Sequence, residues 1–204
     1  MKQFSGYDDA KKAAQFVSGE RLPKGAYVCQ ILGVKFEEGK IANDGTKYSD
    51  RLIVQFDVVE GDYQNFFRMQ YNNNSNEDKR YKGRTSVYIP NDDGTKEDTW
   101  RKTDFARWTK SLEESNAGYV WDWNESLWKN KYIGIVFGET GTVIDGKEIV
   151  FTEARFPISV EAVRSGKVPE AKFKSKNGYG EQSKSSEPSK NTKSPDAIEE
   201  ELPF

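Results

Sequence analysis

The segment from Tyr48 to Val59 reads YSDRLIVQFDVV and is the clearest strand in the chain. Its residues alternate between an apolar set and a mainly polar set: Leu52, Val54, Phe56 and Val58 against Arg51, Ile53, Gln55 and Asp57. An alternation with a period of two is typical of a strand with one face in the core and the other facing outward. The segment therefore predicts a strand with Arg51 and Asp57 on its outward face.

Further strands are expected on both sides of this segment. They are rich in β-branched and aromatic residues and are bounded by turn residues. Asn65–Tyr71 and Thr85–Pro90 are interpreted as two extended pieces of the third strand. The other expected strands are Ala26–Phe36, Lys131–Gly138 and Lys147–Phe156, the last two joined by a hairpin at Asp145-Gly146.

One helix is expected between the third and fourth strands. Asp98 or Thr99 is suited to cap its start, and it runs to about Ser115. Phe105, Trp108 and Leu112 share one face of this helix, which predicts that they pack on the sheet.

These elements predict a mainly β protein with one or two helices. A five-stranded Greek-key barrel of the OB fold has this layout, with its helix between strands 3 and 4. An immunoglobulin-type sandwich needs more short strands and no such helix. We expect the OB fold to occupy residues 1–173 and residues 174–204 to form a disordered linker and tip, because residues 177–194 are almost entirely polar, Gly or Pro.

Composition limits the chemistry of the protein. There is no histidine and a single cysteine, Cys29, which lies in an apolar run and is expected to be a small buried residue. The missing histidines remove His-based catalysis and His-ligated metal sites, and the carboxylates are scattered over turns. We therefore expect no enzyme activity, no cofactor and no metal site. No apolar stretch approaches 18 residues, which predicts a cytoplasmic protein without membrane association.

Aromatic and basic residues interleave in the middle of the chain. Arg51 lies on the outward phase of its strand, Tyr88 is out of phase with its apolar neighbours, and Tyr81 has only charged residues or Gly beside it. Either Phe66 or Phe67 is expected to be exposed, because a flat strand cannot bury both. Cations that follow phosphates and aromatic faces that stack on bases are typical of single-strand binding. The candidate DNA contacts are Tyr48, Arg51, Phe67, Arg68, Tyr71, Arg80, Tyr81, Lys82, Arg84 and Tyr88.

The sequence ends in an acidic run followed by a short apolar tip: Glu199, Glu200, Glu201, Leu202, Pro203 and Phe204. This ending resembles the acidic C-terminal tip of bacterial single-stranded DNA-binding proteins, in which carboxylates precede an aliphatic residue, Pro and Phe. Three short segments of the body resemble phage-encoded members of that class: residues 4–8, 22–27 and 166–169.

The resemblance implies an OB fold and a role in phage DNA replication, recombination or repair within a bacterial host. It also implies that the tip recruits replication or recombination proteins: Leu202 and Phe204 would fill an apolar pocket, and Glu199 to Glu201 would meet basic residues at its rim. The expected function is largely sequence-independent binding and protection of single-stranded DNA. Two alternatives remain open: a protein-interaction adaptor without DNA binding, and a metal-dependent nuclease that acts on single strands. The oligomeric state is left open.

Overall fold

The computed structural model describes residues 21–41, 43 and 48–180, and its described part is mainly β with three α-helices. The helices are α2 (Phe66–Asn72), α3 (Lys96–Ser115) and α4 (Val160–Arg164), and a 3₁₀ turn, η1, spans Glu125–Trp128. The strands are β1 (Gly25–Glu37), β2 (Arg51–Val58), β3 (Arg84–Tyr88), β4 (Tyr132–Ile144), β5 (Lys147–Ile158) and β6 (Lys174–Ser175).

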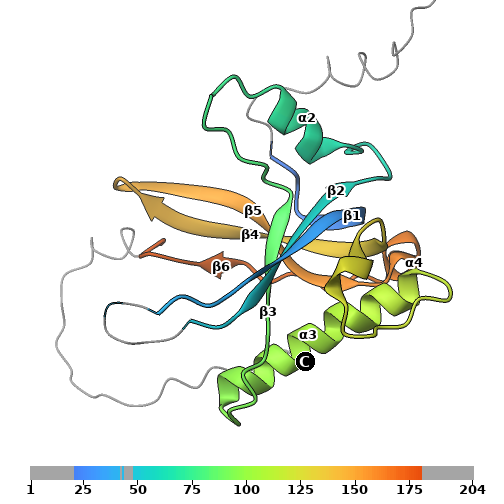
Figure 1. Ribbon diagram of the computed structural model, residues 1–204. Coiled ribbons are helices and arrows are strands. Elements are labelled where there is room, and N and C mark those ends of the chain that lie inside the picture. Colours follow the sequence, from blue (N-terminus) through green and yellow to red (C-terminus); the bar gives the residue numbers. More distant parts are fainter. Residues whose placement is uncertain (1–20, 42, 44–47, 181–204) are drawn as a thin grey trace, which may run out of the picture.

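All six strands belong to one open sheet. Five of them follow the order β3-β2-β1-β4-β5 with antiparallel pairing, and β6 pairs in parallel with β4. The long strand β1 pairs with β4 through residues 25–30 and with β2 through residues 29–37. Figure 1 shows α2 and α3 at opposite ends of the sheet, with the β4–β5 ribbon extending to one side.

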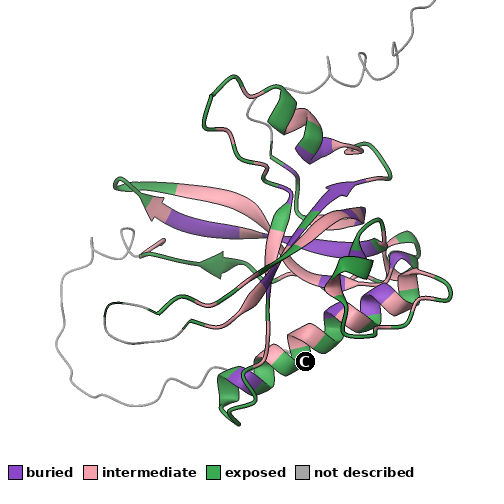
Figure 2. Cartoon of the chain, viewed as in Figure 1, coloured by how far each residue is buried: buried purple, intermediate pink, exposed green. Residues whose placement is uncertain are grey.

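The core contains the apolar residues that the alternation in β2 predicts. Leu52, Val54, Phe56 and Val58 are all buried, and Cys29 is fully buried beside them. The predicted helix between strands 3 and 4 is confirmed as α3, whose Trp108 and Leu112 are buried. Figure 2 shows buried residues along the central strands and along one side of α3. The predicted inward faces of β2 and α3 therefore pack in one core.

The ends of several elements follow local sequence signals. Asp145 and Gly146 both have positive φ angles, of 50° and 73°, as the two-residue hairpin between β4 and β5 requires. α3 begins at Lys96, earlier than predicted, because the Thr95 hydroxyl rather than Asp98 or Thr99 caps it and accepts a hydrogen bond from the Asp98 N–H at 3.1 Å.

The segment Asn65–Tyr71 is not a strand, so this prediction is wrong. Asn65 has a left-handed backbone, with φ of 62°, and the helix α2 follows it directly. Both Phe66 and Phe67 are buried, which a flat strand would not permit. Asp57 is also buried rather than outward, because its carboxylate accepts hydrogen bonds from backbone N–H groups at the start of this helix.

The folded part of the chain continues past the predicted boundary at residue 173. Beyond it, β6 pairs with Thr140 and Gly141 of β4. The Asn177 amide donates to the Thr142 hydroxyl at 3.2 Å, so residues 177–180 are not part of a disordered linker as predicted. The remainder of the predicted tail, including Glu199 to Phe204, lies outside the described residues. No described helix is long and apolar enough to span a membrane.

Candidate nucleic-acid interface

The outward side chains of β2 and β3, together with Lys35 of β1, form a continuous surface that we call the β2–β3 face. Cross-strand register brings its members together. Arg51 lies opposite Tyr88, and Gln55 lies opposite Arg84. On the other side of β2, Lys35 lies opposite Ile53. The members of the β2–β3 face are Lys35, Arg51, Ile53, Gln55, Arg84, Ser86 and Tyr88, and none of them is buried.

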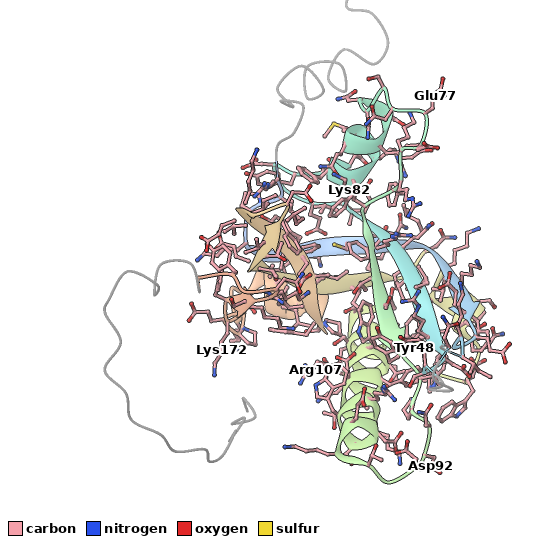
Figure 3. The ribbon with its side chains drawn as sticks, turned by 90° about the vertical axis from the view of Figure 1, so that its left-hand side faces the viewer. Tyr48, Glu77, Lys82, Asp92, Arg107 and Lys172 are labelled. Carbon is pink, nitrogen blue, oxygen red and sulfur yellow. The ribbon has the colours of Figure 1, made fainter. Side chains whose placement is uncertain are left out.

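Two exposed tyrosines lie at the end of this face that is remote from α2. Tyr88 is 37% exposed, and the guanidinium of Arg101 on α3 lies 5.7 Å from its ring centre. Tyr48 is 62% exposed, and its backbone N–H donates to the Lys40 carbonyl at 2.9 Å. In Figure 3, Lys82 lies near one end of β3 and Tyr48 lies toward the other. The Tyr48 ring, and the part of the Tyr88 ring that Arg101 leaves exposed, are therefore available for contact with a ligand on the face.

The charge on the face is mainly positive. Arg51 pairs with Glu37, with 3.0 Å between Nη2 and Oε2, and this hydrogen bond lowers the pKa of the Glu37 carboxyl. Lys35 also lies near Glu37, at 3.6 Å. Because one carboxylate is shared between two cations and Arg84 adds a third, the face keeps a net positive charge.

A second cationic group lies beside the face, on α2 and on the loop that leads into β3. The loop is held against β2 by two hydrogen bonds. The Phe56 N–H donates to the Gly83 carbonyl at 2.8 Å, and the Tyr81 hydroxyl donates to the Phe56 carbonyl at 3.0 Å. The exposed cations of this group are Arg68, Arg80 and Lys82. Lys79 covers the Tyr71 ring, with its Nζ 4.7 Å from the ring centre.

Two of the predicted stacking residues have structural roles instead. Phe67 is only 7% exposed, and its ring packs edge-to-face against Phe56. Tyr81 is half-buried, and burial together with the nearby charge of Asp57 raises the pKa of its phenol. The phenol therefore stays protonated and donates to the Phe56 carbonyl. The charged residues beside Tyr81 in the sequence did not indicate this hydrogen bond, because the accepting carbonyl belongs to Phe56, 25 residues earlier on β2.

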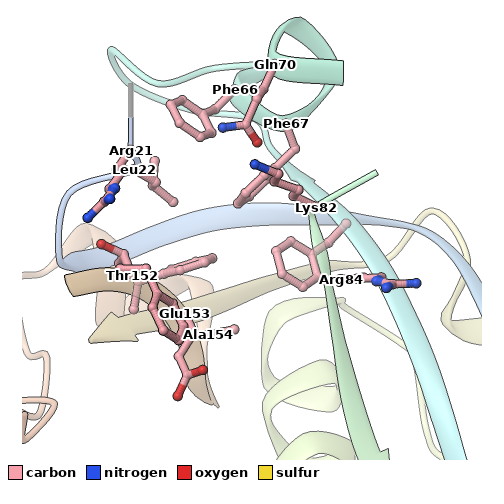
Figure 4. Close-up of a pocket in the computed structure, with 13 residues that line it drawn as sticks. Arg21, Leu22, Phe66, Phe67, Gln70, Lys82, Arg84, Thr152, Glu153 and Ala154 are labelled. Carbon is pink, nitrogen blue, oxygen red and sulfur yellow. The ribbon is translucent and has the colours of Figure 1, made fainter. Parts of the chain in front are cut away.

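A cavity of about 440 Å³ opens where α2, β3 and β5 approach one another, and we call it the seam cavity. In the order of the described sheet, β3 and β5 are the two ends, and no pairing joins them. The cavity is lined by Arg21, Leu22, Phe56, Phe66, Phe67, Gln70, Lys82, Arg84, Phe137, Phe151, Thr152, Glu153 and Ala154 (Figure 4).

The predicted contact residues therefore fall into two adjoining groups. Tyr48, Arg51, Arg84 and Tyr88 belong to or border the β2–β3 face, whereas Arg68, Tyr71, Arg80 and Lys82 belong to the second cationic group. The sequence prediction missed Lys35 and Gln55, which the strand register adds to the face. It also missed the seam cavity, whose walls come from distant parts of the chain and carry no local signal.

Within the described residues, no group of three or more His, Cys, Asp or Glu side chains is arranged to hold a metal ion. Comparison with known proteins adds no relative: no protein-family model matches the chain, and no curated protein sequence matches it significantly. The function is therefore inferred from the fold, the site and the sequence motifs.

Proposed function

We propose that this protein binds single-stranded DNA, largely independently of sequence, with the strand lying across the β2–β3 face. The observation that carries the proposal is the cross-strand register that places Arg51 beside Tyr88 and Arg84 beside Gln55 on one unburied surface. Cations bind the phosphates, and exposed rings stack on bases with roughly 1–3 kcal/mol per base. This binding requires no particular base, because every base has an aromatic face.

The arrangement of the strands supports an OB-like barrel as the scaffold. The OB fold is a partly open, five-stranded Greek-key barrel whose strands 2 and 3 face the nucleic acid. The order β3-β2-β1-β4-β5, with α3 inserted between β3 and β4, is compatible with that barrel when the seam between β3 and β5 stays open. In this scaffold the β2–β3 face is the surface on which the single-stranded DNA lies.

A titration of labelled oligo(dT) followed by fluorescence anisotropy tests the proposal. We expect binding at low salt that weakens as salt rises, with a slope of roughly −0.7 per phosphate contacted, because bound cations release counterions from the strand. Duplex DNA of equal length is expected to bind more weakly, since its bases have no free faces. An absence of binding to oligo(dT) at low salt would exclude the proposed function.

We further propose that residues 199–204 recruit a partner protein of DNA replication or recombination. The proposal rests on the chemistry of these residues, which lie outside the described part of the structure. Burying an aromatic side chain such as Phe204 gains roughly 1.5–3 kcal/mol, and the three glutamates steer the tip toward a basic rim. Such a contact is weak and reversible.

Deletion of Leu202 to Phe204 separates this role from DNA binding. We expect oligo(dT) affinity to stay within about twofold, because the β2–β3 face is intact, and association with a purified replication or recombination partner to fall at least about tenfold. Partner association by a chain that binds no DNA would favour the adaptor alternative. Equal association with and without the deleted residues would contradict the recruiting role.

A further inference from the structure

The seam cavity has the properties of a binding site for a flat aromatic ring that carries phosphate. We propose that it holds one nucleobase of the bound strand, turned out of the run of bases on the β2–β3 face. This inference rests on the proposed function and adds a specific subsite to it. The cavity volume of about 440 Å³ falls within the roughly 300–1,000 Å³ of small-ligand sites.

Aromatic side chains form a large part of the cavity wall. Five phenylalanines line it: Phe56, Phe66, Phe67, Phe137 and Phe151. The first four are buried and hold one another in place, with ring centres 5.2 Å apart for Phe66 and Phe67 and 6.1 Å apart for Phe67 and Phe137. Phe151 on β5 is only partly buried. A rigid aromatic wall of this kind favours a planar apolar ligand.

Polar groups enter the cavity from two sides. Gln70 contributes an amide from α2, and Thr152 contributes a hydroxyl from β5. Figure 4 shows Gln70 reaching from α2 toward the space bounded by Phe66, Phe67 and Lys82. An amide and a hydroxyl both donate and accept hydrogen bonds, as the edge of a nucleobase requires.

The charge around the cavity suits a phosphate-bearing ligand. Arg21, Lys82 and Arg84 contribute three cations. Among the described residues that line the cavity, Glu153 is the single acid. Its Oε1 accepts a hydrogen bond from Arg155 Nη1 at 2.7 Å and lies 3.3 Å from Lys176 Nζ, so its charge is compensated. The cavity therefore attracts anions despite this carboxylate.

The cavity also continues the β2–β3 face. Arg84 belongs to both, because it lies opposite Gln55 on the face and also lines the cavity. A DNA strand that runs along β3 past Tyr88, Ser86 and Arg84 reaches the cavity at the first residue of β3. One base can therefore turn inward while the phosphates beside it remain on the cations.

Photo-crosslinking of the full chain to oligo(dT) carrying one 5-iodouracil tests this assignment. We expect a crosslink to Phe151, the one partly exposed phenylalanine among the described residues of the lining, identified by mass spectrometry. Filling the cavity with Ala154→Met is expected to reduce its yield and to lower oligo(dT) affinity roughly tenfold. Gln70→Ala, at a half-buried position of α2 that lines the cavity, is a second variant and is expected to weaken the same crosslink. Ala106→Met, on the exposed side of α3, is the matched control and is expected to change neither quantity.

The outcomes distinguish the cavity from the wider proposal. Oligo(dT) that binds but crosslinks only to Tyr48 and Tyr88 would overturn the cavity assignment and leave the proposed function standing. No oligo(dT) binding at all would overturn both. The assignment would also be overturned if dTMP alone bound the cavity as tightly as the oligonucleotide does, which would make it a free-nucleotide site. A cavity crosslink that appears only after deletion of residues 1–20 would show that the preceding segment occupies it, and would overturn the assignment as well.

Discussion

Replacing Asp57 with alanine is expected to lower the free energy of unfolding by about 3 kcal/mol or more. The buried carboxylate accepts three backbone hydrogen bonds: from Val58 at 2.9 Å, from Phe67 at 3.0 Å and from Arg68 at 3.0 Å. Two of these donors are N–H groups at the start of α2, which have no partner within the helix. Each buried donor left without an acceptor costs about 1–3 kcal/mol.

Urea unfolding followed by circular dichroism measures this loss. Asp62→Ala removes an exposed carboxylate a few residues away and is the matched control, for which we expect a change within about 0.5 kcal/mol. Asp57→Asn keeps one acceptor oxygen, and its loss of unfolding free energy is expected to lie between those of Asp57→Ala and Asp62→Ala. A loss below about 1 kcal/mol in Asp57→Ala would contradict the capping role, since it would mean that the three donors find other partners.

The triple variant Arg51→Ala, Arg84→Ala and Tyr88→Ala is expected to lower oligo(dT) affinity at least about a hundredfold at low salt. It removes two cations and one exposed ring from the β2–β3 face. Loss of one aromatic ring that stacks on a base lowers the binding free energy by roughly 1–3 kcal/mol on its own. Loss of two phosphate contacts also reduces the slope of log affinity against log salt by roughly 1.4.

A matched control removes the same kinds of side chain elsewhere. Lys110→Ala, Lys129→Ala and Tyr132→Ala also takes away two exposed cations and an exposed tyrosine, from α3, from the residue after η1 and from the start of β4. We expect its oligo(dT) affinity to stay within about threefold of the parent, because only long-range charge is lost. Equal losses in the two triple variants would mean that net charge, rather than the β2–β3 face, determines the affinity.

Elements specified by local sequence could be predicted, and β2 is the clearest case. Its alternation of apolar and polar residues identifies the buried face correctly from Leu52 to Val58. The hairpin at Asp145-Gly146 and the helix that ends near Ser115 also depend on residues close in sequence. These signals are reliable because the deciding interactions lie within a few residues of one another.

The helix α2 could not be predicted from local sequence, because it depends on a distant residue. It spans only seven residues and has no side-chain cap of its own at Asn65. Short helices are marginal without tertiary support, and here the support comes from Asp57, ten residues before Phe67. The same contact explains why Asp57, in an outward phase of the alternation, is nevertheless buried.

For the candidate site, the sequence predicts which residues of β2 and β3 face outward. It does not predict how those residues are placed relative to one another. The phase of β2 and β3 gives Arg51 and Tyr88 correctly as unburied residues. The pairing of Arg84 with Gln55 requires the register between strands, which the sequence does not contain. The seam cavity brings Gln70, Lys82 and Thr152 together from three separate segments, so only the folded chain reveals it.

Amide hydrogen exchange, measured by mass spectrometry with and without saturating oligo(dT), tests the central claim most directly. Oligo(dT) bound across the β2–β3 face is expected to slow amide exchange in β3 and in the loop from Lys79 to Gly83, with smaller effects in β2. The C-terminal half of α3 and the residues of η1 lie away from the face and are expected to be unchanged. Slowed exchange confined to α3 and η1, or no change anywhere on oligo(dT) addition, would contradict the account.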